Sequence, residues 1–318
     1  MECIVVGGGI IGMLCARELA RAGCRVRIVE RGALGGESSW AGGGILSPLY
    51  PWRSPEAVTA LADWGQRHYP GLARELAADT GIDPEWDPSG LLILDAADTD
   101  AASDWAERHQ VALEQIEDPV RISALEPACR VSGRALWCPG VAQIRNPRLI
   151  RALRDDLVRR GVLLSEQSPV TDILQRDGRI VGVRTEHDTL HADAVIVAAG
   201  AWSARVLGML DIRIEVRPVR GQMLLYRAQP GFIRHILIEA GHYVIPRRDG
   251  RVLVGSTVED AGFDKETTPD AREELRQAAE ALVPGLARCE IEQHWSGLRP
   301  GSANEIPYIG PVPGVQGL

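Results

Sequence analysis

A glycine-rich turn near the N-terminus is the feature that most constrains the fold of this chain. The segment Gly7-Gly8-Gly9-Ile10-Ile11-Gly12 fits G-x-G-x-x-G and lies between an apolar run at 3–6 and a helical pattern of apolar residues at 10–22. In such a turn the first glycine permits a tight reversal, the second admits a pyrophosphate to the helix N-terminus, and the third lets helix and strand pack closely. The context predicts a Rossmann-like α/β unit that binds a dinucleotide.

An acidic residue stands where such a unit needs one. The next apolar run, 26–29, ends in Glu30, 18 residues after Gly12. A carboxylate at this place accepts hydrogen bonds from a ribose diol. The cofactor-binding residues expected in this part of the chain are Gly7, Gly9, Ile10, Ile11, Gly12, Glu30 and its neighbour Arg31.

The remainder of the chain alternates helical and strand patterns. Ser54-Pro55-Glu56 and Asn146-Pro147 predict an N-cap and a helix start, with helices to about residue 80 and through residue 160. The run 193–200 is apolar on both faces, as in a central parallel strand, whereas 32–44 is rich in Gly, Ser and Ala and predicts a loop. Beyond residue 211, short apolar runs separated by turns predict a mostly antiparallel α+β region with one helix. We expect strands at 91–94, 162–164, 180–184, 194–198, 222–226, 236–238, 242–245, 252–254 and 290–295, a helix at 270–282, and only helix and loop at 98–127.

Composition excludes several classes of function. The 318 residues correspond to about two domains at roughly 150 residues each. The chain has a formal charge of −8 and so lacks the excess of basic residues that binding to nucleic acid or an anionic membrane needs, and we expect neither as a partner. Lys265 is the only lysine, in a polar stretch, which excludes a Walker A loop and a pyridoxal enzyme. The six cysteines form no Cys-x-x-Cys, so we expect no metal site. Without a leader pattern or a long apolar run, we expect a cytoplasmic protein.

The glycine fingerprint by itself fits either NAD or FAD, and the following loop separates the two. The segment 37–46, Glu-Ser-Ser-Trp-Ala-Gly-Gly-Gly-Ile-Leu, resembles the loop after the ribose acid in the D-amino-acid oxidase and glycine oxidase family of FAD-dependent oxidoreductases. The resemblance extends over nearly the whole chain and is greatest to the glycine oxidases of the thiamine pathway. Further matching blocks are 168–170, 198–203, 219–223, 243–247, 297–302 and 307–310.

The resemblance implies FAD, held tightly but without a covalent bond, in a discontinuous domain. It assigns 1–48, 141–210 and 297–318 to the FAD-binding domain, and 49–140 and 211–296 to the substrate domain. It also implies a longer chain, with a further strand, a Gly-His-x-Arg-x-Gly loop and a final helix. The further cofactor-binding residues it implies are Ser38, Ser39, Gly43, Gly44 and Ile45 for the diphosphate and flavin, Val170 for a backbone contact to adenine, and Gly200 in the turn after a strand.

The resemblance also implies a reaction and two substrate-binding residues. Arg299 corresponds to the arginine that binds the amino-acid carboxylate, and Tyr243 to the tyrosine whose hydroxyl reaches the same group. A guanidinium fork fits a carboxylate bidentately and would orient the α C–H bond toward the flavin. Glycine would pass a hydride from its α carbon to the flavin, giving an imine that hydrolyses to glyoxylate and ammonia, while oxygen becomes hydrogen peroxide.

Several alternatives stay open at this point. The same fold serves sarcosine oxidases. It also serves D-amino-acid dehydrogenases, which pass electrons to a quinone or carrier instead of oxygen. A non-catalytic flavoprotein subunit also fits, because a dinucleotide site does not prove turnover. The family further suggests that the imine feeds thiazole synthesis for thiamine and that the protein is a homotetramer.

Overall fold

Three β-sheets organise the chain in the computed structural model, which describes residues 1–130 and 133–318. The first is a four-stranded parallel sheet in the order β10-β1-β2-β6. Helices α1 (Ile10–Arg21) and α6 (Asn146–Arg159) cover one face, where Val5, Met13 and Leu149 share a buried core. The Rossmann-like α/β unit predicted from the glycine turn is confirmed. Its strands are β1 (Glu2–Val6), β2 (Arg25–Val29), β6 (Leu163–Ser165) and β10 (Ala194–Val197).

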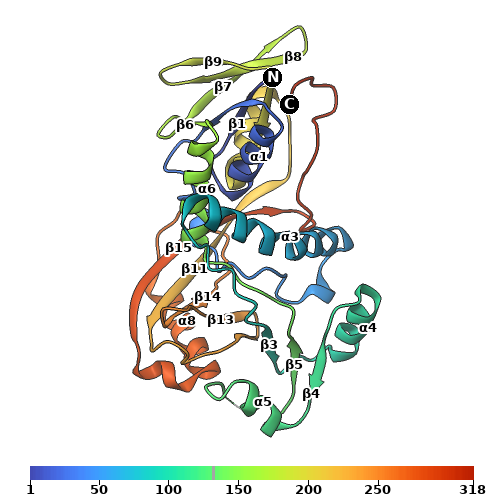
Figure 1. Ribbon diagram of the computed structural model, residues 1–318, viewed down its shortest axis with the longest axis vertical. Coiled ribbons are helices and arrows are strands. Elements are labelled where there is room, and N and C mark those ends of the chain that lie inside the picture. Colours follow the sequence, from blue (N-terminus) through green and yellow to red (C-terminus); the bar gives the residue numbers. More distant parts are fainter. Residues whose placement is uncertain (131–132) are drawn as a thin grey trace.

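A small antiparallel sheet covers the other face of the parallel sheet. It consists of β7 (Val170–Arg176), β8 (Arg179–Thr185) and β9 (Thr189–His191). Because side chains alternate along a strand, Ile4 and Val6 of β1 point away from α1 and pack with Ile173 and Ile180 of this sheet. Figure 1 shows it at one end of the molecule, near both chain termini.

The third sheet has eight strands in the order β15-β11-β14-β13-β12-β3-β5-β4. All neighbouring pairs are antiparallel except the parallel pair β12 and β3, which confirms the mostly antiparallel region. Helix α8 (Pro269–Leu282) covers one face through Leu275 and Leu282. The strands are β3 (Leu91–Leu94), β4 (Glu114–Ile116), β5 (Ala135–Cys138), β11 (Val216–Arg227), β12 (Ile236–Glu239), β13 (His242–Pro246), β14 (Arg251–Gly255) and β15 (Glu290–Ser302).

The remaining helices lie at the edges and between the sheets. The longest, α3, crosses the middle of the molecule between the parallel sheet and the eight-stranded sheet (Figure 1). Among the described residues no helix has the length and apolar character needed to cross a membrane. The helices are α2 (Ser38–Ala41), α3 (Glu56–Thr80), α4 (Thr99–His109), α5 (Pro119–Leu125) and α7 (Ser203–Leu207), with 3-10 turns at Pro51–Arg53, Gly200–Trp202, Gly208–Leu210 and Pro284–Arg288.

Several local predictions were wrong. The strand at 194–198 is β10, which lies at the edge of its sheet; it is apolar on both faces because helices and the β7–β9 sheet cover both. The stretch 32–44 contains the short helix α2, and 98–127 contains the strand β4. The N-cap of α3 is Pro55, without a side-chain hydrogen bond, so Ser54 does not cap it. The N-cap of α6 is Arg145, and Asn146 is the first residue of that helix instead of its cap. Strand β15 continues through residue 297, where one border of the predicted domain division lies; the division itself stays a prediction.

Candidate functional site

The turn between β1 and α1 requires glycine at two positions. Gly7 has φ +109°, and a Cβ there would lie 2.4 Å from the carbonyl oxygen of Ala198. A Cβ on Gly12 would lie 1.9 Å from the carbonyl oxygen of Gly7. Only glycine lets α1 approach the backbones of β1 and β10 this closely. The turn thus stands at the carboxyl ends of the central strands, where ligands bind in open α/β sheets.

The first turn of α1 presents backbone donors. Its N-cap, Gly9, has no side chain to accept them, and the Ile10 N–H donates to Ser39 Oγ at 2.9 Å. The N–H groups of Ile11 and Gly12 have no acceptor among the residues that the structure describes. A helix N-terminus with free donors carries positive partial charge and attracts an anion such as a diphosphate.

Glu30 lies directly beside this turn. Its carboxylate accepts from the Gly8 N–H at 2.7 Å and from the Gly32 N–H at 2.8 Å, and the residue is 9% exposed. The Ser168 N–H donates to the Glu30 carbonyl at 2.8 Å, which brings the start of β7, and with it Val170, to the same strand end.

Arg31 lies beside the turn that begins at Gly200, next to Glu30. The Arg31 guanidinium lies 3.6 Å above the ring of Trp202 and pairs with Glu37. Gly200 has φ +53° and begins a 3-10 turn three residues after the end of β10. The predicted cofactor-binding residues before and after β10 therefore meet at one end of the parallel sheet.

The glycine loop after α2 lies against the eight-stranded sheet. Gly44 has φ +76°, and a Cβ there would lie 2.0 Å from the Ile144 carbonyl oxygen. A Cβ on Gly43 would lie 2.8 Å from Ile245 Cδ1 and 3.2 Å from Tyr243 Cε2. Glycine at position 43 lets the loop backbone lie directly on β13, and glycine at position 44 lets it lie against the backbone of Ile144, just before α6.

Tyr243 lies at the centre of this sheet face. Its hydroxyl lies 3.3 Å from Met223 Sδ, and the residue is buried. Met223, Gly255 and Tyr243 stand in register on β11, β14 and β13, so they share one face of the sheet. A Cβ on Gly255 would lie 2.6 Å from the tyrosine ring, so glycine makes the space that the ring occupies.

Arg299 lies on the same face, on β15. Its guanidinium fills the place of a missing side chain at Gly221, where a Cβ would lie 2.3 Å from Nη1. It donates to the Thr257 carbonyl at 3.2 Å and to Ser256 Oγ. None of the carboxylates in the described part of the chain pairs with it, so this half-buried cation has only neutral partners. Tyr243 and Arg299 thus flank the segment Gly255 to Thr257 from two sides.

Several residues that build this site had no predicted role. A glycine inside a strand often marks a close approach of another group, and Gly221, Gly255 and Gly297 are such glycines. A Cβ on Gly297 would lie 2.5 Å from Ala41 Cβ of α2. Arg247 stood in a matching block without a role, and its burial could not be read from the sequence.

The residues at the carboxyl ends of the parallel strands fit a dinucleotide. A Cβ on Gly7 or Gly12 would fill the space beside the glycine turn, the start of α1 offers free N–H donors, and the Glu30 carboxylate lies beside them. Comparison with known proteins agrees. Residues 2–318 match the model of the FAD dependent oxidoreductase family, DAO. The chain belongs to this family, which confirms the resemblance, and it is an FAD-dependent amino-acid oxidoreductase.

The chain is similar to several proteins named glycine oxidase. The chain is 49% identical to the glycine oxidase of Pseudomonas aeruginosa, covering 99% of this chain and 87% of that protein. It is 47% identical to the glycine oxidase of Pseudomonas putida, covering 100% and 87%. The crystal structure of glycine oxidase from Geobacillus kaustophilus matches with a TM-score of 0.92 and 29% identity, over 98% of this chain and 85% of that one.

Proposed function

We propose that this protein oxidises glycine, and to a lesser extent sarcosine or small D-amino acids, with FAD as cofactor. Glycine, water and oxygen would give glyoxylate, ammonia and hydrogen peroxide. The observation that carries the proposal is the face shared by Arg299, Tyr243 and the Gly43–Gly44 loop. A cation without a carboxylate partner, beside a phenol, is suited to bind the carboxylate of an amino acid.

The proposed substrate roles follow from the hydrogen-bond donors that Arg299 and Tyr243 have available. Arg299 has five N–H donors, of which two contact Thr257 and Ser256, so a bidentate pair with a substrate carboxylate remains available. Tyr243 donates only to the weak acceptor Met223 Sδ and would exchange this contact for a carboxylate oxygen. Binding by these two residues would fix the α carbon of the substrate relative to the glycine loop.

The cofactor assignment uses the residues at the end of the parallel sheet. We assign the diphosphate to the start of α1 with Ser38 and Ser39, and the flavin side to Gly43, Gly44 and Ile45. Glu30 would bind the ribose, and backbone atoms of Val170 the adenine. When bound, FAD would accept the two electrons of the amino acid and pass them to oxygen. The protein supplies orientation and donors.

The family resemblance supports further parts of the proposal. We propose that the imine product serves thiazole synthesis for thiamine, in the cytoplasm, and that the protein forms homo-oligomers, with a tetramer suggested by the family. We also propose the two-domain division, with the border near the end of the chain moved to the end of β15, because that strand pairs with β11 along its whole length.

The test is an amino-acid panel on the purified, FAD-loaded protein, with peroxide and glyoxylate both measured. Glycine should lead the panel, with sarcosine next, and peroxide should match glyoxylate one to one. Glycine-dependent dye reduction without peroxide under air would instead identify a dehydrogenase. Failure of glycine and every other panel member to bleach the flavin under nitrogen would contradict an enzymatic role.

A further inference from the structure

One buried arginine takes no part in the proposed chemistry, yet it contacts the cofactor loop. Arg247 follows β13 and is 8% exposed. Its Nη2 donates to the Gly43 carbonyl at 2.7 Å, and its Nη1 donates to Gln143 Oε1 at 2.6 Å and to the Ile144 carbonyl at 3.3 Å. All three acceptors are neutral, and two of them belong to the backbone.

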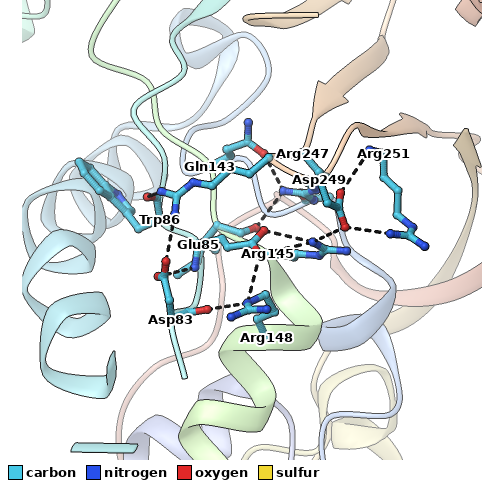
Figure 2. A network of polar contacts seen from close by, with 12 residues as sticks. Asp83, Glu85, Trp86, Gln143, Arg145, Arg148, Arg247, Asp249 and Arg251 are labelled. Carbon is cyan, nitrogen blue, oxygen red and sulfur yellow. Dashed lines mark hydrogen bonds and ion pairs between the residues drawn. The ribbon is translucent and has the colours of Figure 1, made fainter. Parts of the chain in front are cut away.

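The acidic residues nearest to Arg247 are held by other arginines. Arg145 pairs with Glu85 at 3.2 Å and with Asp249 at 2.9 Å, and Arg251 pairs with Asp249 at 2.9 Å, as Figure 2 shows. Burial, reinforced by the charge of Arg145, lowers the pKa of Arg247 to about 10, so the side chain stays protonated at neutral pH. A buried cation without a hydrogen-bonded carboxylate opposes folding, and a function would account for its presence.

The carbonyl that Arg247 holds fixes the next peptide group. In a trans peptide the C=O of Gly43 and the N–H of Gly44 point in opposite directions. Because the carbonyl points at the guanidinium, the Gly44 N–H must point away from it. Among the described residues the N–H groups of Gly43, Gly44 and Ile45 find no acceptor, although Gly43 itself is buried. Donors of this kind are normally satisfied by a ligand when the protein does not satisfy them.

We propose that Arg247 is a positioning residue that holds the Gly43–Gly44 peptide with its N–H directed at the bound cofactor. This inference rests on the proposed assignment of that loop to FAD. Arg247 also reaches Gln143 and Ile144, which pair with the strand-like segment after Gly44, so one side chain fixes the loop from two directions. A planar fork suits this task, because its donors diverge at a fixed angle.

The experiment compares FAD binding by variants of the full-length apo-protein. Arg247→Met removes the charge and the donors, whereas Arg247→Lys keeps the charge without the fork. Arg248→Gln is the matched control, because Arg248 is the next residue and its contacts are to Asp83 and the Trp86 carbonyl, at the surface. The dissociation constant is measured by quenching of flavin fluorescence, thermal unfolding is measured on each apo-protein, and the visible spectrum is recorded at saturating FAD.

Arg247→Met should raise the dissociation constant of FAD by about tenfold to a hundredfold, because one charge-assisted contact orders the donor. Arg247→Lys should show a smaller rise, and Arg248→Gln should stay within about twofold. The flavin spectrum should shift in both Arg247 variants only. Unchanged affinity and spectrum in both variants would overturn the proposal, as would apo-proteins of both that no longer unfold cooperatively, since Arg247 would then serve stability alone. If the wild-type protein fails to bind FAD, the proposed function fails first.

Discussion

Replacing Arg299 by alanine tests the substrate site most directly. Among residues 1–130 and 133–318 the guanidinium has only the neutral acceptors Thr257 and Ser256, so a substrate carboxylate would be its charged partner. Removing one partner of a desolvated, bidentate ion pair costs about 3–5 kcal/mol. We therefore expect kcat/KM for glycine to fall by roughly 10²–10⁴, since each 1.36 kcal/mol is a factor of ten.

The same substitution should affect the fold much less. Arg299 is half-buried, so water can replace its hydrogen bonds to the Thr257 carbonyl and the Ser256 hydroxyl. Loss of two such contacts lowers the free energy of unfolding by about 1 kcal/mol when solvent compensates in part. FAD affinity should change little, because none of the contacts of Arg299 involves the glycine turn or α2.

The assay is steady-state peroxide formation at varied glycine, with FAD content determined for each preparation. Arg217→Ala serves as the control, since Arg217 lies on the neighbouring strand and pairs with Asp260 in solvent. Arg299→Lys should lie between the wild type and the alanine variant, because the charge remains while the fork is lost. A fully FAD-loaded Arg299→Ala protein with near-normal kcat/KM for glycine would refute the carboxylate assignment.

Three further predictions concern the cofactor and stability. Acid precipitation should release FAD into the supernatant, because none of the six cysteines lies in a block that matches a flavin-linkage site; colour retained by the precipitate would disprove this. Gly12→Ala should lower the free energy of unfolding by about 1–3 kcal/mol and weaken FAD binding, because its Cβ would clash at 1.9 Å, while Gly208→Ala, with open space around it, should do neither in the same denaturant and FAD titrations. Hydrogen bonds from Arg53, and to a lesser extent from Trp52, hold the pKa of the Asp98 carboxyl well below its usual range. This carboxylate thus stabilises the fold above the unfolded pKa of about 3.9, by about 1 kcal/mol given its partial exposure, and the effect is lost as pH falls; Asp98→Asn should show less acid sensitivity in urea unfolding at pH 3 and 7.

The glycine turn could be predicted because its determinants are local. The atom that excludes a Cβ at Gly12 is the carbonyl oxygen of Gly7 in the same turn, and the flanking patterns identify the strand before the turn and the helix after it. The weakly patterned strands could not be predicted in the same way. Strand β4 is the three-residue segment Glu-Gln-Ile, with a single buried side chain, and it forms only by pairing with β5.

The relation between Tyr243 and Arg299 depends on long-range register. Residue 219 pairs with 299 on one side of β11, and Met223 pairs with Gly255 and through it with Tyr243 on the other. Such pairing brings together segments tens of residues apart, and a slip of one residue would turn each side chain to the opposite face. Only the resemblance to a family could connect the two residues before the structure was known.

Alternation along β13 explains why one short segment carries so much of the site. Tyr243, Ile245 and Arg247 follow each other at intervals of two, so they point to the same face of the sheet, whereas Val244 points into the core beneath α8. All three meet Gly43: the tyrosine ring and the isoleucine Cδ1 bound the space where its Cβ would be, and the arginine binds its carbonyl. The proposed substrate contact and the proposed cofactor contact therefore lie on one face of this segment, with Tyr243 within β13 and Arg247 one residue beyond its end. Their separation is set at about 3.3 Å per residue, because the Arg247 N–H donates to the Arg251 carbonyl at 2.8 Å and so keeps the end of the segment paired with β14.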